Sequence, residues 1–139
     1  MSQIEERSQA VRLYEQGVKA MNSKRFAEAE AWFSQALRNN PRFAEAHNYL
    51  GYLLVMQGPA NYLMALEHYN RAIRLKSNLA EAYEYRGMLF LKMDRKSAAE
   101  KDLATLRELN PGLAVDLERV MKEGKEASGS IVKQGGRTR

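Results

Sequence analysis

Apolar residues recur along this 139-residue chain at the three- and four-residue spacings of an α-helix, and no segment alternates apolar and polar residues in the manner of a strand. The pattern predicts helices over residues 3–22, 26–39, 44–57, 62–76, 80–93 and 96–109. Ser2 and Glu5 form a capping-box pattern at the first helix start. Gly58-Pro59 and Asn110-Pro111 stop the third and sixth helices, because proline cannot continue a helix. The sequence therefore predicts an all-α fold.

The central segment, residues 44–58, is apolar on nearly every side. A helix of this kind is buried between neighbours, whereas a surface helix keeps one polar face. Its fifteen residues are interrupted by Glu45, His47 and Asn48, so it is too short and too polar to span a membrane. The rest of the chain must cover this segment on several sides.

Three series of residues recur with nearly constant spacing. Glycines inside helical patterns are spaced by 34 and then 36 residues, at Gly17, Gly51 and Gly87. The spacing is 36 and then 34 for Ala29, Ala65 and Ala99, and again for Pro41, Ser77 and Pro111. One two-residue insertion between Gly51 and Ala65 explains all three series. The chain therefore contains three helix–turn–helix units, over residues 10–43, 44–79 and 80–113.

The recurring residues have a common physical explanation. Glycine inside a helix costs about 0.5–1 kcal/mol relative to alanine, so its repeated use requires a compensating contact. Close approach of the second helix of each unit, at the small alanine, would supply one. Large residues recur beside this contact, at Phe33, Tyr69 and Leu103.

In these marks the chain resembles the tetratricopeptide repeat (TPR) family, whose unit is a 34-residue helix–turn–helix. The resemblance covers residues 10–113 and implies a right-handed α-solenoid of three repeats. The departures are the insertion, Ser77 in place of proline, Leu106 in place of a small residue, and His47 where a large apolar residue is usual. None of them changes the predicted fold.

The remaining segments complete the predicted architecture. An amphipathic helix over about 113–123 would cover the exposed side of the last repeat, as solenoids require. We therefore expect one domain over residues 1–123. Residues 124–139, rich in Gly, Ser, Lys and Arg, are expected to form a disordered basic tail. That tail carries a net charge of +3 out of the chain's +5, and elsewhere cations alternate with Glu and Asp, as on a solvated surface.

The first helix of each unit has a second apolar face beside the one that carries the glycines. By the family resemblance, this face lines the concave side of the superhelix and forms an apolar groove. Its residues are Tyr14, Val18, Met21, Asn48, Tyr52, Val55, Glu84, Met88 and Leu91. Exposed apolar surface of this extent usually marks a partner site. The alternative is that these side chains fill gaps between neighbouring repeats.

The face predicts a protein–protein interaction module, such as an adaptor, scaffold or chaperone-like protein, that holds an extended peptide or an amphipathic helix. One subclass of the family clamps a C-terminal carboxylate with Lys, Asn and Arg; here only Asn48 could contribute, and Glu84 would repel the carboxylate. The alternative function is structural, through self-association into a homo-oligomer. Nucleic-acid binding through the basic tail is a weaker third hypothesis, with a steep salt dependence.

Catalysis is not expected from this sequence. It has no cysteine, no Gly-rich phosphate loop and no serine–histidine–aspartate motif. His47 and His68 are placed on different helices without a carboxylate or histidine partner, His47 in the interior and His68 on an outer surface. We therefore expect no metal and no cofactor. The N-terminus lacks a signal-peptide pattern, which favours the cytoplasm unless a leader has been removed.

Overall fold

The computed structural model describes the backbone of residues 2–134 and the side chains of residues 2–124. Within that range the chain is all-helical, with no strand. The elements in chain order are α1 (Gln3–Asn22), α2 (Phe26–Asn39), α3 (Ala44–Met56), the 3-10 turn η1 (Pro59–Asn61), α4 (Tyr62–Leu75), α5 (Ala80–Lys92), α6 (Lys96–Leu109) and α7 (Pro111–Gln134). The first six predicted helices are confirmed to within one residue at each end.

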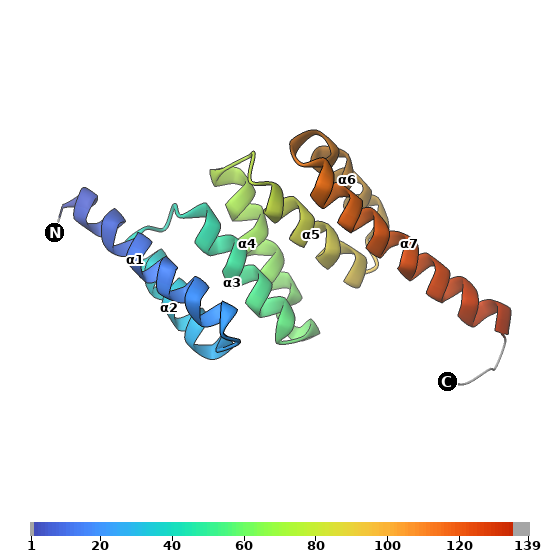
Figure 1. The fold of residues 1–139 in the computed structure, drawn as a ribbon, viewed down its shortest axis with the longest axis horizontal. Helices are drawn as coiled ribbons and strands as arrows, with labels where there is room; N and C mark the ends of the chain where they lie inside the picture. The colour runs from blue at the N-terminus through green and yellow to red at the C-terminus, as the bar shows by residue number, and fades with distance from the viewer. Residues whose placement is uncertain (1, 135–139) are drawn as a thin grey trace.

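The helices form antiparallel pairs that stack side by side. Within each of the three units the two helices pack on one another, α1 on α2, α3 on α4, and α5 on α6, and α7 packs on α5 and α6. In Figure 1, α1, α3 and α5 lie on the near side and the second helices lie behind them, with the N-terminus and α7 at opposite ends. The predicted α-solenoid of three repeats with a C-terminal helix is confirmed.

The central helix α3 is the most enclosed of helices α1 to α6. Seven of its thirteen residues are buried, which is more than in any other of these helices. Leu53 packs into the cluster formed with α1 and α2, while Leu54 packs against Tyr69 of α4 and Leu89 of α5. Helices on both sides therefore cover α3, as the pattern of residues 44–58 predicted.

Two of the three repeated glycines contact the second helix of their own unit. A methyl group on Gly17 would lie 2.6 Å from Phe33 Cε1, and one on Gly51 would lie 2.8 Å from Tyr69 Cε1. These distances are shorter than any real carbon–carbon contact, so only glycine fits beside the aromatic ring. The second helix approaches the glycine closely in the first two units, as predicted. The contact is made mainly by the aromatic ring and not by the alanine, although Ala65 O lies 3.2 Å from the methyl position at Gly51.

The third unit differs from this expectation. A methyl group on Gly87 would meet Leu117 Cδ2 of α7 at 2.7 Å, and Leu103 is not among its nearest neighbours. Leu103 has no ring with which to reach across the helix pair, and the fully buried Leu117 fills the space instead. Helix α7 thus supplies a packing residue that the earlier units take from their own second helix.

The backbone φ angle is positive at the same place in every unit, where the first helix ends. The values are 60° at Lys24, 113° at Gly58 and 58° at Asp94. In the first and third units the next residue closes the helix, with Arg25 N donating to Ala20 O and Arg95 N donating to Phe90 O, both at 2.8 Å. Pro59 has no N–H for this bond, so the second unit turns through η1 instead.

Helix α7 is longer than the predicted cap. It begins at Pro111 and continues to Gln134, past the expected end near residue 123. Gly124 lowers helix propensity by about 1 kcal/mol without preventing a helix, and no proline follows to stop it. Residues 135–139 of the predicted basic tail lie outside the described residues, and the division into a domain over 1–123 and a tail over 124–139 stays a prediction.

Candidate functional site

The nine residues of the predicted groove lie on α1, α3 and α5, the helices on the near side of Figure 1. None of the nine is fully exposed. Seven are half-buried, and the two polar ones, Asn48 and Glu84, are buried, with 3% and 8% of their surface accessible. The structure therefore shows a face whose apolar residues are shared between packing and solvent.

Helix α1 contributes an aromatic cluster at one end of this face. The Tyr14 ring lies 4.7 Å from the Phe43 ring and 6.0 Å from the Tyr49 ring, measured between centroids. Burial raises the pKa of the Tyr14 hydroxyl, and the neighbouring Tyr49 raises it further. Val18 and Met21 pack against the same core cluster. This part of the face fills the junction between the first two units.

A second aromatic pair joins the second and third units. The Tyr52 ring of α3 lies 5.0 Å from the Tyr85 ring of α5, and Tyr85 lies 6.2 Å from Tyr69 of α4. Burial raises the pKa of Tyr85 to about 12, so its hydroxyl stays protonated at neutral pH. Val55 packs beside this group. Tyr52 therefore stabilises the repeat junction as well as lining the face.

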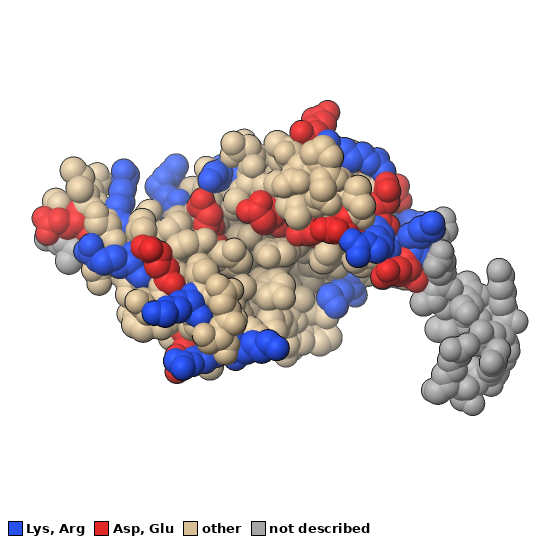
Figure 2. Space-filling model, viewed as in Figure 1, with Lys and Arg blue, Asp and Glu red and all other residues tan. Residues whose placement is uncertain are grey.

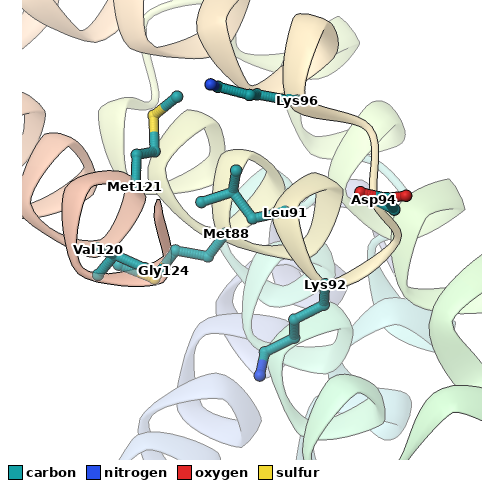
Figure 3. Close-up of a pocket in the computed structure, with 8 residues that line it drawn as sticks. All are labelled: Met88, Leu91, Lys92, Asp94, Lys96, Val120, Met121 and Gly124. Atoms are coloured by element: carbon teal, nitrogen blue, oxygen red, sulfur yellow. The ribbon is translucent and has the colours of Figure 1, made fainter. Parts of the chain in front are cut away.

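An open cavity lies at the other end of the face, between α5 and α7. Its volume is about 630 Å³, and Figure 3 shows Met88 and Leu91 of α5 opposite Val120 and Met121 of α7. Its rim holds three charged residues and a glycine, namely Lys92, Asp94, Lys96 and Gly124. The cavity is large enough for one or two apolar side chains of a ligand.

Sequence reasoning missed four residues of this face. Tyr49 and Tyr85 occupy equivalent positions 36 residues apart, so the repeat register could have revealed them. Val120 and Met121 were expected only to cover the last repeat. Their place in the cavity depends on the angle at which α7 crosses α5, and no spacing in the sequence encodes that angle.

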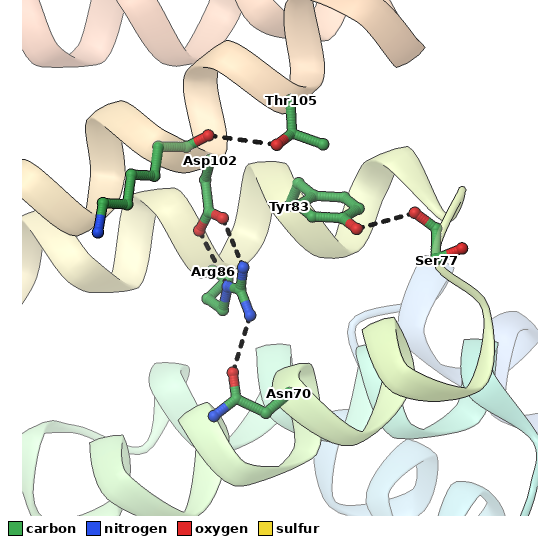
Figure 4. Close-up of polar contacts among 7 residues, drawn as sticks. Asn70, Ser77, Tyr83, Arg86, Asp102 and Thr105 are labelled. Atoms are coloured by element: carbon green, nitrogen blue, oxygen red, sulfur yellow. Dashed lines mark hydrogen bonds and ion pairs between the residues drawn. The ribbon is translucent and has the colours of Figure 1, made fainter.

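A buried polar network ties α5 to its neighbours behind the face. Figure 4 shows the Arg86 guanidinium between Asp102 of α6 and Asn70 of α4. Arg86 Nε donates to Asp102 Oδ2 at 3.0 Å, Nη2 donates to Oδ1 at 2.6 Å, and Nη1 donates to Asn70 Oδ1 at 2.9 Å. The same guanidinium lies 5.6 Å from the Tyr83 ring centroid. Since all these partners are internal, Arg86 fixes the helix arrangement.

The two histidines are partners, contrary to the expectation that each stands alone. His47 Nδ1 lies 3.1 Å from His68 Nδ1, and His47 Nε2 lies 2.9 Å from the Pro41 carbonyl oxygen. The carbonyl can only accept, so neutral His47 donates from Nε2 and accepts at Nδ1 from His68. His68 is half-buried, not on an outer surface. The repeat pattern could not predict this contact, because it compares equivalent positions of different units, whereas His47 and His68 lie on the two helices of one unit.

The structure offers no arrangement suited to metal binding in the part it describes. Among these residues there is no group of three or more His, Cys, Asp and Glu side chains that could hold an ion. Nor does any helix in this range have the length and apolar character needed to cross a membrane.

Three solved structures with a similar architecture are TPR domains. The TPR domain of Arabidopsis OM64 matches with a TM-score of 0.76 and 17% sequence identity, over 86% of this chain and 98% of that chain. The first TPR of Spaghetti (RPAP3), bound to the HSP90 peptide SRMEEVD, matches with a TM-score of 0.75 and 20% identity, over 86% and 95%.

The second TPR of Spaghetti (RPAP3), bound to the same HSP90 peptide, gives a TM-score of 0.71 and 17% identity, over 78% of this chain and 97% of that chain. No protein-family model and no curated protein sequence matches this chain. The chain has the tetratricopeptide repeat fold, as the sequence predicted.

Proposed function

We propose that this protein is a protein–protein interaction module that binds an extended peptide or an amphipathic helix of a partner along α1, α3 and α5, ending at α7. The observation that carries the proposal is the open apolar cavity between α5 and α7, lined by Met88, Leu91, Val120 and Met121. Methionine suits such a surface because its flexible thioether adapts to different partners. The role would be that of an adaptor, a scaffold or a chaperone-like protein, without catalysis.

The structural neighbours support a peptide as the ligand. Two of them are TPR domains bound to a peptide. In this chain the predicted groove combines half-buried Tyr, Val, Met and Leu side chains with two buried polar groups, Asn48 and Glu84. A ligand would therefore gain most of its affinity from burial of apolar side chains, at about 25 cal/mol per Å² of apolar surface.

Selection from a phage-displayed library of random peptides tests this proposal. We expect the wild-type protein to enrich peptides with apolar residues, and the double variant Tyr52→Glu, Met88→Glu to lose them. The matched control is Leu63→Glu, Met64→Glu on α4, because these two residues are 68% and 53% exposed and belong to none of the core clusters. Circular dichroism must show that both double variants keep their helical content.

Two results would contradict the proposal. The first is no enrichment by the wild-type protein. The second is enrichment that survives the groove variant, which would place the binding surface outside the groove. If the control variant then loses the peptides, the binding surface lies on α4.

Self-association is the second candidate function. It is favoured by apolar side chains exposed on the helices at the two ends of the stack, with Ile4 of α1 78% accessible and Val115 of α7 60% accessible. Contact between opposite ends would build a head-to-tail assembly, because the two surfaces differ. Sedimentation velocity over a range of protein concentrations separates this function from peptide binding.

A further inference from the structure

Glu84 is a buried carboxylate without a partner. Only 8% of its surface is accessible, yet no hydrogen bond or ion pair joins it to any other described residue. Asn48 Oδ1 is the one side-chain atom in this range that is both sealed from solvent and unpaired, so the Glu84 oxygens retain some contact with solvent. A carboxylate in this state is poorly solvated and would gain from a cation or a donor.

The surroundings of Glu84 do not neutralise it. Burial raises the pKa of Glu84, and the carboxylates of Asp116 and Glu81 raise it further. Figure 2 shows Asp and Glu side chains gathered across the middle of this face. Three nearby cations are engaged elsewhere, since Arg86 pairs with Asp102, Lys76 with Glu45, and Arg119 with Asp116. Among the described residues, no cation forms an ion pair with Glu84.

Asn48 gives a second, independent sign of a missing donor. It occupies the position equivalent to Glu84 in the preceding unit and is 3% accessible, and its Oδ1 accepts no hydrogen bond. A buried acceptor without a donor costs about 1–3 kcal/mol. A half-turn about χ2 exchanges the oxygen with the amide nitrogen, so Asn48 can also present its oxygen toward the face.

The carboxylate and the apolar cavity lie on one side of α5. Glu84, Met88 and Leu91 follow each other at four- and three-residue spacing, the spacing of one helix face. At a rise of about 1.5 Å per residue, Met88 lies about 6 Å and Leu91 about 10 Å along the helix axis from Glu84. An extended peptide advances about 3.3 Å per residue, so two or three residues cover this distance.

We propose that the peptide bound by this face carries a lysine or arginine side chain that pairs with Glu84, and an apolar side chain two or three residues away that enters the cavity between α5 and α7. This inference rests on the proposed function and specifies the chemistry of its ligand. An acidic peptide such as the SRMEEVD bound by the Spaghetti domains would meet Glu84 with like charge.

The peptide selection described above gives the first test. Wild-type protein is expected to enrich Lys or Arg over Asp or Glu at one position, two or three residues from an apolar residue. Selection on the Glu84→Gln variant is expected to lose this bias while retaining the apolar residue. Enriched peptides without a basic bias would overturn this inference and leave the proposed function standing, whereas no enrichment at all would overturn both.

Fluorescence anisotropy with one synthetic peptide gives the second test. The probe is the most enriched wild-type peptide, compared with the same peptide carrying Glu at the basic position. We expect the basic peptide to bind wild-type protein at least about tenfold more tightly, a difference of about 1.4 kcal/mol. In the Glu84→Gln variant, the two peptides should differ in affinity by no more than about twofold.

The matched control is Glu100→Gln on α6, which removes the same charge from an exposed position. It is expected to leave the tenfold preference in place. A preference that persists in Glu84→Gln would overturn the pairing with Glu84. A preference that Glu100→Gln abolishes equally would also overturn it, because the effect would then come from overall charge. Since glutamine has the shape of glutamate and removes a buried charge, the thermal midpoint of Glu84→Gln should equal or exceed that of wild type.

Discussion

At the scale of single residues, the structure contains side chains that the fold holds in unfavourable states. Lys24 and Asp94 adopt left-handed backbone conformations, although the same position in the second unit is glycine. For a residue with a Cβ atom this conformation costs about 1–2 kcal/mol. The cost is met by the bonds from Arg25 and Arg95 that close the helices.

Lys24→Gly is therefore expected to stabilise the protein. Relief of the left-handed strain exceeds the extra chain entropy of unfolded glycine, which is about 0.5–1 kcal/mol, so the net gain is about 0.5–1 kcal/mol. Asp94→Gly should gain less, because aspartate tolerates this conformation better than lysine. Urea denaturation measures the change in the free energy of unfolding for both variants. A lower midpoint for Lys24→Gly would contradict the assignment of strain to this turn.

The paired histidines make stability depend on pH. Burial lowers the pKa of both His47 and His68 in the folded protein, and His47 lowers that of His68 further. The unfolded chain therefore binds more protons than the folded one at mildly acidic pH. Stability from this pair is complete above the unfolded pKa of about 6.5, and is lost as pH falls toward the lower folded values.

Chemical denaturation at pH 7.5 and pH 5.5 checks this prediction. Each pKa unit of separation between folded and unfolded states costs about 1.4 kcal/mol once the unfolded histidine is protonated. The raised pKa of Glu84 acts in the opposite direction, because protonation of that buried carboxyl favours the folded state. The loss of stability between pH 7.5 and pH 5.5 should be smaller in the His68→Asn variant than in wild type, because the variant lacks the histidine pair. An equal loss in the two proteins would show that other groups are responsible.

Residue-scale contacts were the least predictable part of the structure. The repeated glycines could be interpreted because a glycine inside a helix requires the close approach of a neighbouring helix, and Gly17 and Gly51 show that approach. No pattern in the sequence indicated that Arg86 pairs with Asp102. Such pairs depend on which helices lie side by side and on their side-chain rotamers, and neither is encoded in residue spacing.

At the scale of helices, the sequence predicted a boundary correctly wherever a repeat or a proline marked the end of a helix. Helices α1 to α6 match the predicted ranges because the same pattern occurs three times and because Pro59 and Pro111 mark two of the boundaries. Helix α7 lacks both kinds of signal at its far end and continues to Gln134. The interval between Gly51 and Ala65, to which the sequence assigns the two-residue insertion, contains η1.

The contact between Gly87 and Leu117 predicts a measurable coupling between α5 and α7. Leu117→Ala should cost about 2–5 kcal/mol, because the side chain is fully buried. Gly87→Ala should cost about 1–3 kcal/mol in wild type, since its methyl group would overlap Leu117. In the Leu117→Ala background that overlap is gone, so Gly87→Ala should cost at least about 1 kcal/mol less. Additive costs would mean that the two helices do not share this space.

At the scale of the whole molecule, the three units stack in a row and the nine predicted groove residues lie along it. The stack was predictable, because each unit exposes an apolar side that only a neighbour can cover. Which of the nine residues pack against a neighbouring unit and which line an open surface could not be predicted. Tyr14 and Tyr52 contact rings of the neighbouring unit, while Met88 and Leu91 also line an open cavity.

We expect the protein to be monomeric from micromolar to millimolar concentration. The exposed large apolar residues are distributed over six helices, α1, α2, α3, α4, α6 and α7, whereas a stable interface usually gathers them in one patch. Sedimentation velocity measures the mass directly. Growth of larger species with concentration would favour self-association instead, and loss of those species in Ile4→Glu or Val115→Glu would identify the surface involved.

Helix α7 has a consequence for how a ligand could be detected. It covers the last repeat through Leu117 and forms one wall of the cavity through Val120 and Met121. A molecule that occupies the cavity would bridge α5 and α7 and resist their separation. At a free concentration 100 times its dissociation constant, such a ligand adds about 2.7 kcal/mol to the free energy of unfolding. Hydrogen exchange along α5 and α7 would then slow on binding, so this protein's own unfolding can report its ligand.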